Sequence, residues 1–178
     1  MKEKSCKRVP KKYSAKSRIL ALIPAGTLFL VAIPLFVILL AAPIDTWLGL
    51  PKFVREPFNF IAAMFFVVPG FSLAAWSVWV QFTRAEGTPI PAMAPRRLLV
   101  KGPYAYCRNP MLLGILIFYI GIGVLNGSPS YFSLMAPLVG ALLAYIKLVE
   151  ERELENRFGL AYKRYKKKTP FIIPRKRY

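Results

Sequence analysis

The densest group of chemically capable side chains lies between Glu150 and Gly159. These ten residues hold four of the eight acidic residues of the protein. Carboxylates contribute little to the orientation of a membrane protein, so their concentration here needs another reason. One reason is pairing within a helix, because Glu153 and Arg157 have the favourable i, i+4 order. The other is a cationic ligand, for which Glu150 and Glu151 are the better candidates because they directly follow a hydrophobic run.

A second unusual segment, Thr83–Asn109, is polar and rich in proline. Its part from Gly87 to Asn109 has 23 residues, whereas a simple connector needs only a few. Prolines at positions 89, 91, 95 and 103 remove amide donors and fix φ, which predicts irregular backbone. Such backbone, with Leu98, Leu99, Val100, Tyr104 and Tyr106 beside it, can present amides, carbonyls and aromatic faces to a ligand at the membrane surface. The alternative is an interfacial re-entrant loop that its tyrosines anchor.

The composition argues against several kinds of chemistry. The chain has no histidine, which is the commonest metal ligand and general base, so zinc enzymes and Ser-His-Asp hydrolases are disfavoured. The two cysteines, Cys6 and Cys107, fall in segments that we place in the cytosol, so we expect no disulfide. We predict no bound metal.

Four hydrophobic runs must position these two segments. The chain is 56% hydrophobic yet carries a net charge of +18, a combination typical of membrane proteins. The uncharged runs are Ile19–Ala42, Pro57–Phe82, Pro110–Leu125 and Ser130–Val149. A transmembrane helix needs roughly 20 apolar residues, and the first run is too long for a signal peptide. The sequence therefore predicts an all-α integral membrane protein with about four transmembrane helices, the last two forming a hairpin, and a cytosolic amphipathic C-terminal helix.

Lysine and arginine separate cleanly between the two sides of the predicted bundle. The first 18 residues hold eight, Thr83–Asn109 holds five and Glu150–Tyr178 holds ten, whereas Pro43–Glu56 holds two and Asn126–Pro129 none. The positive-inside rule then places both termini in the cytosol. These basic clusters adjoin hydrophobic runs, so we attribute them to topology and membrane lipids rather than to nucleic acid.

Two motifs, in this order, resemble the isoprenylcysteine carboxyl methyltransferase and phospholipid methyltransferase superfamily. They are LVKGPYAYCRNPM at Leu99–Met111 and EERELENRFGLAYKRY at Glu150–Tyr165, followed by Pro170 and Pro174. The upstream GTPIP resembles prokaryotic members, which favours a prokaryotic plasma membrane over the endoplasmic reticulum. The resemblance covers about Gly87–Pro174 and implies a small multi-span enzyme that uses S-adenosylmethionine without a Rossmann domain.

The resemblance also implies a binding site for S-adenosylmethionine between the two motifs. Carried over by position, the cofactor-binding candidates are Leu98, Leu99, Val100, Tyr104, Asn109, Pro110, Met111, Leu112, Glu150 and Glu151. Adenine needs an apolar or aromatic slot, the ammonium and ribose hydroxyls need carboxylates, and the cofactor carboxylate needs Arg108 or backbone amides. Methyl transfer mainly requires alignment and a water-poor site, so the catalytic residues stay open, with Arg108 and Lys147 as candidates.

Three positions differ from the pattern of the superfamily. Many members have histidine at the position of Asn109, and a tyrosine is common at the position of Leu112. The carboxyl methyltransferases have an arginine that addresses the substrate where this chain has Ile146. Lys147 is adjacent, but on a regular helix its side chain points about 100° away. We therefore expect poor methylation of prenylcysteine carboxylates.

These observations predict three parts of the chain: a basic cytosolic tail at 1–18, two transmembrane helices within 19–82, and a catalytic methyltransferase region at 83–178. The predicted enzyme transfers a methyl group to a lipid-like or apolar small acceptor, whose reactive group is a carboxylate, an amine or a thiol. The alternatives are a phospholipid N-methyltransferase, a small-thiol S-methyltransferase and, in another class, a non-catalytic membrane assembly protein.

Overall fold

The computed structural model describes residues 14–54, 56–85, 88 and 96–174, and all regular elements within them are helical. Most of the expected basic tail and most of the GTPIP motif lie outside the described residues. The elements are α1 (Ala15–Thr27), the π-helical turn η1 (Leu28–Ala32), α2 (Ile33–Leu48), α3 (Phe58–Arg84), the 3₁₀ turn η3 (Gly102–Ala105), α4 (Pro110–Asn126), α5 (Pro129–Tyr145), the π-helical turn η4 (Ile146–Glu150), α6 (Glu151–Phe158) and α7 (Leu160–Lys168).

Three of the helices are long and apolar enough to cross a membrane: Ala15–Leu48, Phe58–Arg84 and Pro129–Phe158. The fourth, α4, has 17 residues and therefore a length of about 26 Å, at the lower limit for crossing a hydrocarbon core of about 30 Å. The prediction of an all-α protein with apolar spans agrees with the structure. The exact number of spans stays a prediction.

The first helix is longer than the sequence predicted. It begins at Ala15 instead of Ile19 and continues to Leu48, through much of the loop expected at Pro43–Glu56. A π-helical turn interrupts it at Leu28–Ala32, directly before Pro34, whose nitrogen has no hydrogen to donate.

The carbonyl of Phe29 is left without a helical partner by this turn. The Ile33 N–H donates to Leu28 O, and in the π register the next donor would be the nitrogen of Pro34. The hydroxyl of Tyr119, from α4, donates to the Phe29 carbonyl at 2.7 Å instead. This bond satisfies a backbone group that has no water to turn to inside a membrane.

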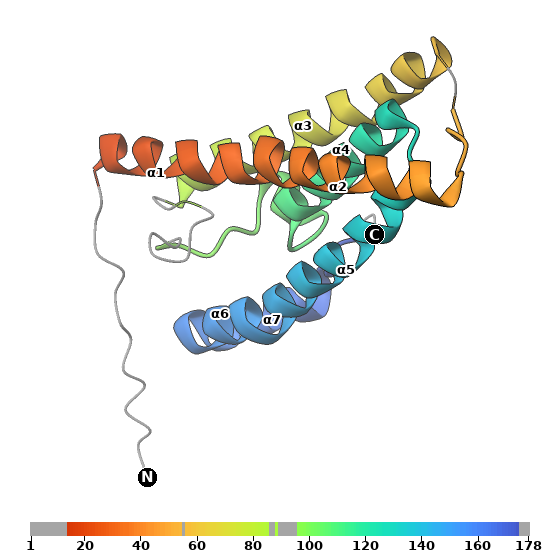
Figure 1. Ribbon diagram of the computed structural model, residues 1–178. Helices are drawn as coiled ribbons and strands as arrows, with labels where there is room; N and C mark the ends of the chain where they lie inside the picture. Colours follow the sequence, from red (N-terminus) through yellow and green to blue (C-terminus); the bar gives the residue numbers. More distant parts are fainter. Residues whose placement is uncertain (1–13, 55, 86–87, 89–95, 175–178) are drawn as a thin grey trace.

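Contacts at both ends show that the four helical segments run back and forth (Figure 1). At one end, the Arg18 guanidinium at the start of α1 donates to the Phe82 carbonyl near the end of α3, at 2.9 Å. At the other end, the Phe53 N–H donates to the Gly127 carbonyl in the turn between α4 and α5, at 3.1 Å. Both long polar segments of the sequence, before α4 and after α5, therefore lie at the first end.

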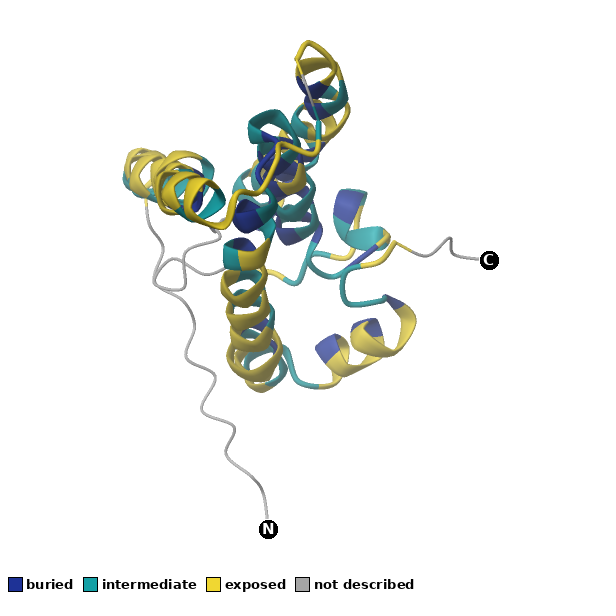
Figure 2. Cartoon of the chain, turned by 45° about the vertical axis from the view of Figure 1, so that its right-hand side comes forward, coloured by how far each residue is buried: buried dark blue, intermediate teal, exposed yellow. Residues whose placement is uncertain are grey.

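Helices α3 and α4 pack backbone against backbone. A Cβ atom added at Gly114 would lie 2.6 Å from the Ala74 nitrogen and 2.7 Å from the Gly70 oxygen, and one added at Gly70 would lie 2.8 Å from the Gly114 oxygen. Small residues at such crossings let membrane helices approach closely. Figure 2 shows the buried residues gathered along the middle of the bundle, with long exposed stretches on the outer helices. The pair α3–α4 is the centre of the fold.

The C-terminal region contains two helices where the sequence predicted one amphipathic helix. Gly159 separates them with φ 56° and ψ −129°, a backbone conformation that residues with a side chain rarely adopt. As a result α7 turns back toward α6 instead of continuing it, and Leu154, Phe158 and Tyr162 all line one cavity.

Candidate functional site

A cavity of about 130 Å³ lies where α3 ends, α4 begins and η4, α6 and α7 pack together. Its lining combines apolar side chains with charged ones from both of the segments that the sequence singled out. Gln81 comes from α3, Arg108 from the loop before α4, and Glu150, Glu153 and Arg157 from η4 and α6. A mixed apolar and charged wall at the end of a helical bundle is typical of a site for a small ligand that carries charges of its own.

Eight of the ten predicted cofactor-binding residues line this cavity: Leu98, Leu99, Tyr104, Asn109, Pro110, Met111, Leu112 and Glu150. Val100 and Glu151 do not belong to the lining. Of the two candidate catalytic residues, Arg108 lines the cavity, whereas Lys147 is exposed and does not. Ile146, which stands in place of the family arginine, is buried and faces the cavity.

The acidic pair is divided by the π-helical turn η4. The Glu151 N–H donates to the Ile146 carbonyl, five residues back, so the helix is widened by one residue at Ile146–Glu150. Glu150 then lines the cavity, and among the described residues its carboxylate has neither a hydrogen bond nor an ion pair. Such turns occur frequently at functional sites. The structure thus leaves one member of the pair available for a ligand.

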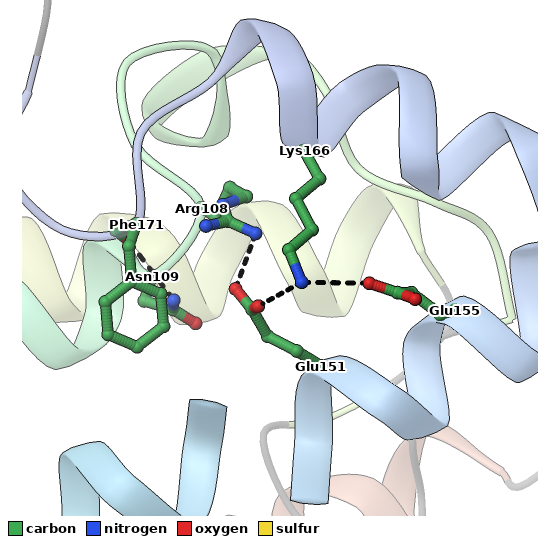
Figure 3. Close-up of polar contacts among 6 residues, drawn as sticks. All are labelled: Arg108, Asn109, Glu151, Glu155, Lys166 and Phe171. Atoms are coloured by element: carbon green, nitrogen blue, oxygen red, sulfur yellow. Dashed lines mark hydrogen bonds and ion pairs between the residues drawn. The ribbon is translucent and has the colours of Figure 1, made fainter. Parts of the chain in front are cut away.

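Glu151 does not line the cavity, and its carboxylate lies between Arg108 and Lys166 (Figure 3). Its side chain is 4% exposed, and its Oε1 lies 2.6 Å from Nη1 of Arg108 while its Oε2 lies 2.9 Å from Nζ of Lys166. The contact to Arg108 joins the two charges without the alignment of a hydrogen bond. Lys166 also pairs with Glu155 at 2.9 Å. A buried carboxylate requires such partners, because burial of an unpaired charge is costly.

The chain after α7 returns to the loop that precedes α4. The Arg108 N–H donates to the Pro170 carbonyl at 2.9 Å, and both the N–H and the side-chain amide of Asn109 donate to the Phe171 carbonyl at 3.2 Å. The Tyr165 hydroxyl donates to the Tyr104 carbonyl at 2.6 Å. These contacts fix the loop that forms one wall of the cavity.

Sequence reasoning missed several residues of the lining, among them Gln81, Tyr162 and Tyr165, and it missed the ion pair of Lys166 with Glu151. The tyrosines lie within the second motif, so the resemblance pointed to their segment but not to their roles. The contacts of Tyr162 and Tyr165 depend on the turn at Gly159, which the sequence pattern of an amphipathic helix does not predict.

Burial keeps the aromatic and thiol groups around the cavity neutral. It raises the pKa of Tyr162 to about 12, with Glu151 adding to the shift. Burial, together with Glu150, also raises the pKa of Tyr104, and burial raises the pKa of Cys107, which is 1% exposed. Since the thiolate is the reactive form of cysteine, we expect Cys107 to be inert in the folded protein.

The lining of the cavity fits the chemical groups of S-adenosylmethionine. Glu150 offers a carboxylate without a protein partner among the described residues, and the buried Nε of Arg108 has no hydrogen-bond acceptor there. These are the two charges that an ammonium and a carboxylate require. The cavity is smaller than the roughly 300–1,000 Å³ of most small-molecule sites. A ligand of that size must therefore extend beyond it or displace part of the lining.

The described residues contain no group of three or more His, Cys, Asp or Glu side chains that could hold a metal ion.

The fold and the cavity together describe a helical protein that has three helices long and apolar enough to cross a membrane and a partly charged cavity at one end of them. A family model described as phospholipid methyltransferase matches residues 58–161, more than half of the chain. The chain therefore belongs to the phospholipid methyltransferase family, as the two motifs predicted. Neither a curated protein nor a solved structure matches the chain. Family membership implies methyltransferase activity in a membrane protein.

Proposed function

We propose that this protein uses S-adenosylmethionine to methylate a lipid-like or apolar small acceptor that reaches the site from the bilayer. The observation that carries the proposal is the cavity itself, where two motifs 40 residues apart in the sequence supply an unpaired carboxylate and a guanidinium. Family membership favours this enzyme over a non-catalytic assembly protein.

The residues of the cavity would hold the cofactor by complementary chemistry. Glu150 would accept hydrogen bonds from its ammonium or ribose hydroxyls, Arg108 would pair with its carboxylate, and Leu98 and Leu99 would contact its adenine. When bound, the cofactor would supply a methyl group on a positively charged sulfur. The sulfur is the leaving group when the acceptor attacks the methyl carbon in line. The protein then needs to align the two groups and exclude water, and the buried tyrosines around the cavity serve the second purpose.

A second cavity supports an acceptor with an apolar chain. It has a volume of about 540 Å³ and lies between the first helix, α4 and α5, where residues such as Phe29, Tyr119 and Leu142 line it. Leu142 precedes Ile146 of the first cavity by one helical turn, or about 6 Å along the axis. An apolar chain in this second cavity would place a reactive group near the first.

We also propose that the end with the cavity faces the cytosol, where S-adenosylmethionine and most of the basic residues would lie. The Lys/Arg distribution supports this orientation, with both termini inside. A prokaryotic plasma membrane is the location that the GTPIP motif favours.

Titration of the purified protein with S-adenosylmethionine tests the cofactor site. Glu150→Gln should weaken binding by roughly 10- to 150-fold, because one charge-assisted hydrogen bond contributes about 1.5–3 kcal/mol. Glu155→Gln is the matched control, since Glu155 lies outside the cavity lining and pairs with Lys166. Equal losses of affinity in the two variants would refute the assignment of Glu150, and a native protein that does not bind S-adenosylmethionine would refute the proposed function.

Ile146 bears on the reactive group of the proposed acceptor, because it stands where the carboxyl methyltransferases have an arginine. A carboxylate taken into a partly desolvated site without a paired cation keeps a desolvation cost of several kcal/mol, so uncharged amines or thiols should be better acceptors. The measurement compares N-acetyl-farnesylcysteine with amine and thiol acceptors in the native protein, in Ile146→Arg and in the control Lys147→Ala. Ile146→Arg should increase turnover of the carboxylate. Strong native turnover of farnesylcysteine would contradict the expectation, and its loss in Arg97→Gln would then identify Arg97, which also lines the cavity, as the cation.

A further inference from the structure

The segment 162–171, named here the C-terminal strap, begins directly after the last residue that the family model matches. Two of its side chains, Tyr162 and Tyr165, line the cavity and are 2% and 6% exposed. The wall of the proposed cofactor site therefore includes residues beyond the matched region, and these residues need contacts that position them.

Hydrogen bonds to backbone carbonyls join the strap to both ends of the loop 104–109. They are the hydrogen bonds of Arg108 to Pro170, of Asn109 to Phe171 and of Tyr165 to Tyr104. The Arg108 guanidinium also lies over the ring of Phe171, 5.6 Å from its centre. These contacts lie at both ends of the loop, so undocking of the strap would remove a support from each end.

Glu151 lies between the loop and the strap and pairs with a cation from each, as Figure 3 shows. It comes from α6 and touches Arg108 of the loop with one oxygen and Lys166 of the strap with the other. Pairing with Glu151 and Glu155 raises the pKa of Lys166, which keeps this side chain charged. Both oxygens of Glu151 are thus engaged by the protein, and its side chain does not line the cavity.

We propose that Glu151 is a positioning residue that ties the loop 104–109 and the C-terminal strap together, so that Arg108 and the strap tyrosines complete the cofactor cavity. In this view the two members of the acidic pair have different roles: Glu150 meets the ligand and Glu151 acts through Arg108 and Lys166. The expected effect of Glu151 on cofactor affinity rests on the proposed function, whereas its expected effect on the docking of the strap does not.

Glu151→Gln keeps the shape of the side chain and removes the charge, leaving Arg108 buried without an anion. Lys166→Met removes only the half-exposed partner and is the milder variant. Lys166→Arg restores the cation, and Lys167→Met is the matched control, because the neighbouring Lys167 is exposed and forms no ion pair with the described residues.

Cys107 supplies a measurement that does not need the cofactor. It is buried and precedes Arg108 in the loop 104–109, to which the strap is bonded. In a Cys6→Ser background its rate of alkylation by a small maleimide reports how often the strap opens. The second measurement is the Kd for S-adenosylmethionine by calorimetric titration of the same proteins in detergent.

Glu151→Gln should speed alkylation of Cys107 by about ten-fold or more and weaken cofactor binding by a similar factor, and Lys166→Met should change both by about three-fold. Lys166→Arg and Lys167→Met should match the native protein.

The inference is overturned if Glu151→Gln weakens binding while alkylation stays native, because Glu151 then binds the ligand directly. It is also overturned if Lys166→Met and Lys167→Met are alike. If Glu151→Gln does not fold, the two lysine variants decide; if the native protein does not bind the cofactor, the proposed function fails and alkylation still decides.

Discussion

The pair α3–α4 and the first helix are attached to the molecule in opposite ways. Along α3 and α4 the backbones touch at Gly70 and Gly114, with no room for a side chain. By contrast, none of the residues of α1 (Ala15–Thr27) is buried, and its neighbour α2 buries only Pro34, Val37 and Ala41. The first region is held by close backbone packing at its glycines, and the second region by a few buried side chains.

The difference separates a rigid frame from a peripheral helix. Helix α3 delivers Gln81 to the cavity and α4 delivers Met111 and Leu112, so their backbone contact fixes the distance between two of its walls. The family match begins at residue 58, the first residue of α3, and leaves the first helix outside. In Figure 1 the helix α5 diverges from α1, and the apolar second cavity opens between the two regions. A loosely attached helix beside that cavity suits an acceptor that enters from the membrane.

The largest expected effect is that of a single methyl group in the frame. Gly114→Ala would place Cβ against the backbone of Ala74 and Gly70, which cannot rotate away, so we expect a loss of about 3 kcal/mol in the free energy of unfolding. Thermal or denaturant unfolding in detergent measures it.

Gly140→Ala is the control for this substitution. Gly140 also lies within a helix, but nothing approaches its Cβ position within 4 Å, so the variant should be unchanged or up to about 1 kcal/mol more stable. Equal stability of the two variants would mean that α3 and α4 do not pack as closely as described, and the contrast between frame and periphery would disappear.

A smaller effect is expected where the first helix is anchored. The carboxylate of Asp45, near the end of α2, accepts hydrogen bonds from the Ser128 hydroxyl and from the Ser130 N–H, the latter at 3.1 Å, and so caps the start of α5. Asp45→Ala should therefore cost about 1 kcal/mol of stability. The neighbouring Thr46→Ala, which loses only a bond to Ala42 within its own helix, should be close to neutral. If Asp45→Ala were as damaging as Gly114→Ala, the first helix would belong to the frame.

The sequence by itself determined the apolar helical character, the family and a part of the cavity lining. Long uncharged runs can satisfy their backbone in a bilayer only as helices, so composition decides this part without tertiary information. The family resemblance likewise grouped Leu98, Tyr104, Asn109 and Glu150, and in the structure all four line one cavity.

Only the tertiary structure separated Glu150 from Glu151 and found the strap. Adjacent residues of a helix point about 100° apart, so the sequence leaves open which carboxylate faces a ligand. In the structure Glu150 lines the cavity, whereas Glu151 pairs with Arg108 and Lys166. The strap depends on the backbone conformation of Gly159, which sends α7 back toward the loop. Both features depend on contacts between residues that are far apart in the sequence. Arg108 and Lys166 pair with Glu151, and Tyr165 of the strap bonds to Tyr104, and the sequence does not indicate that these residues meet.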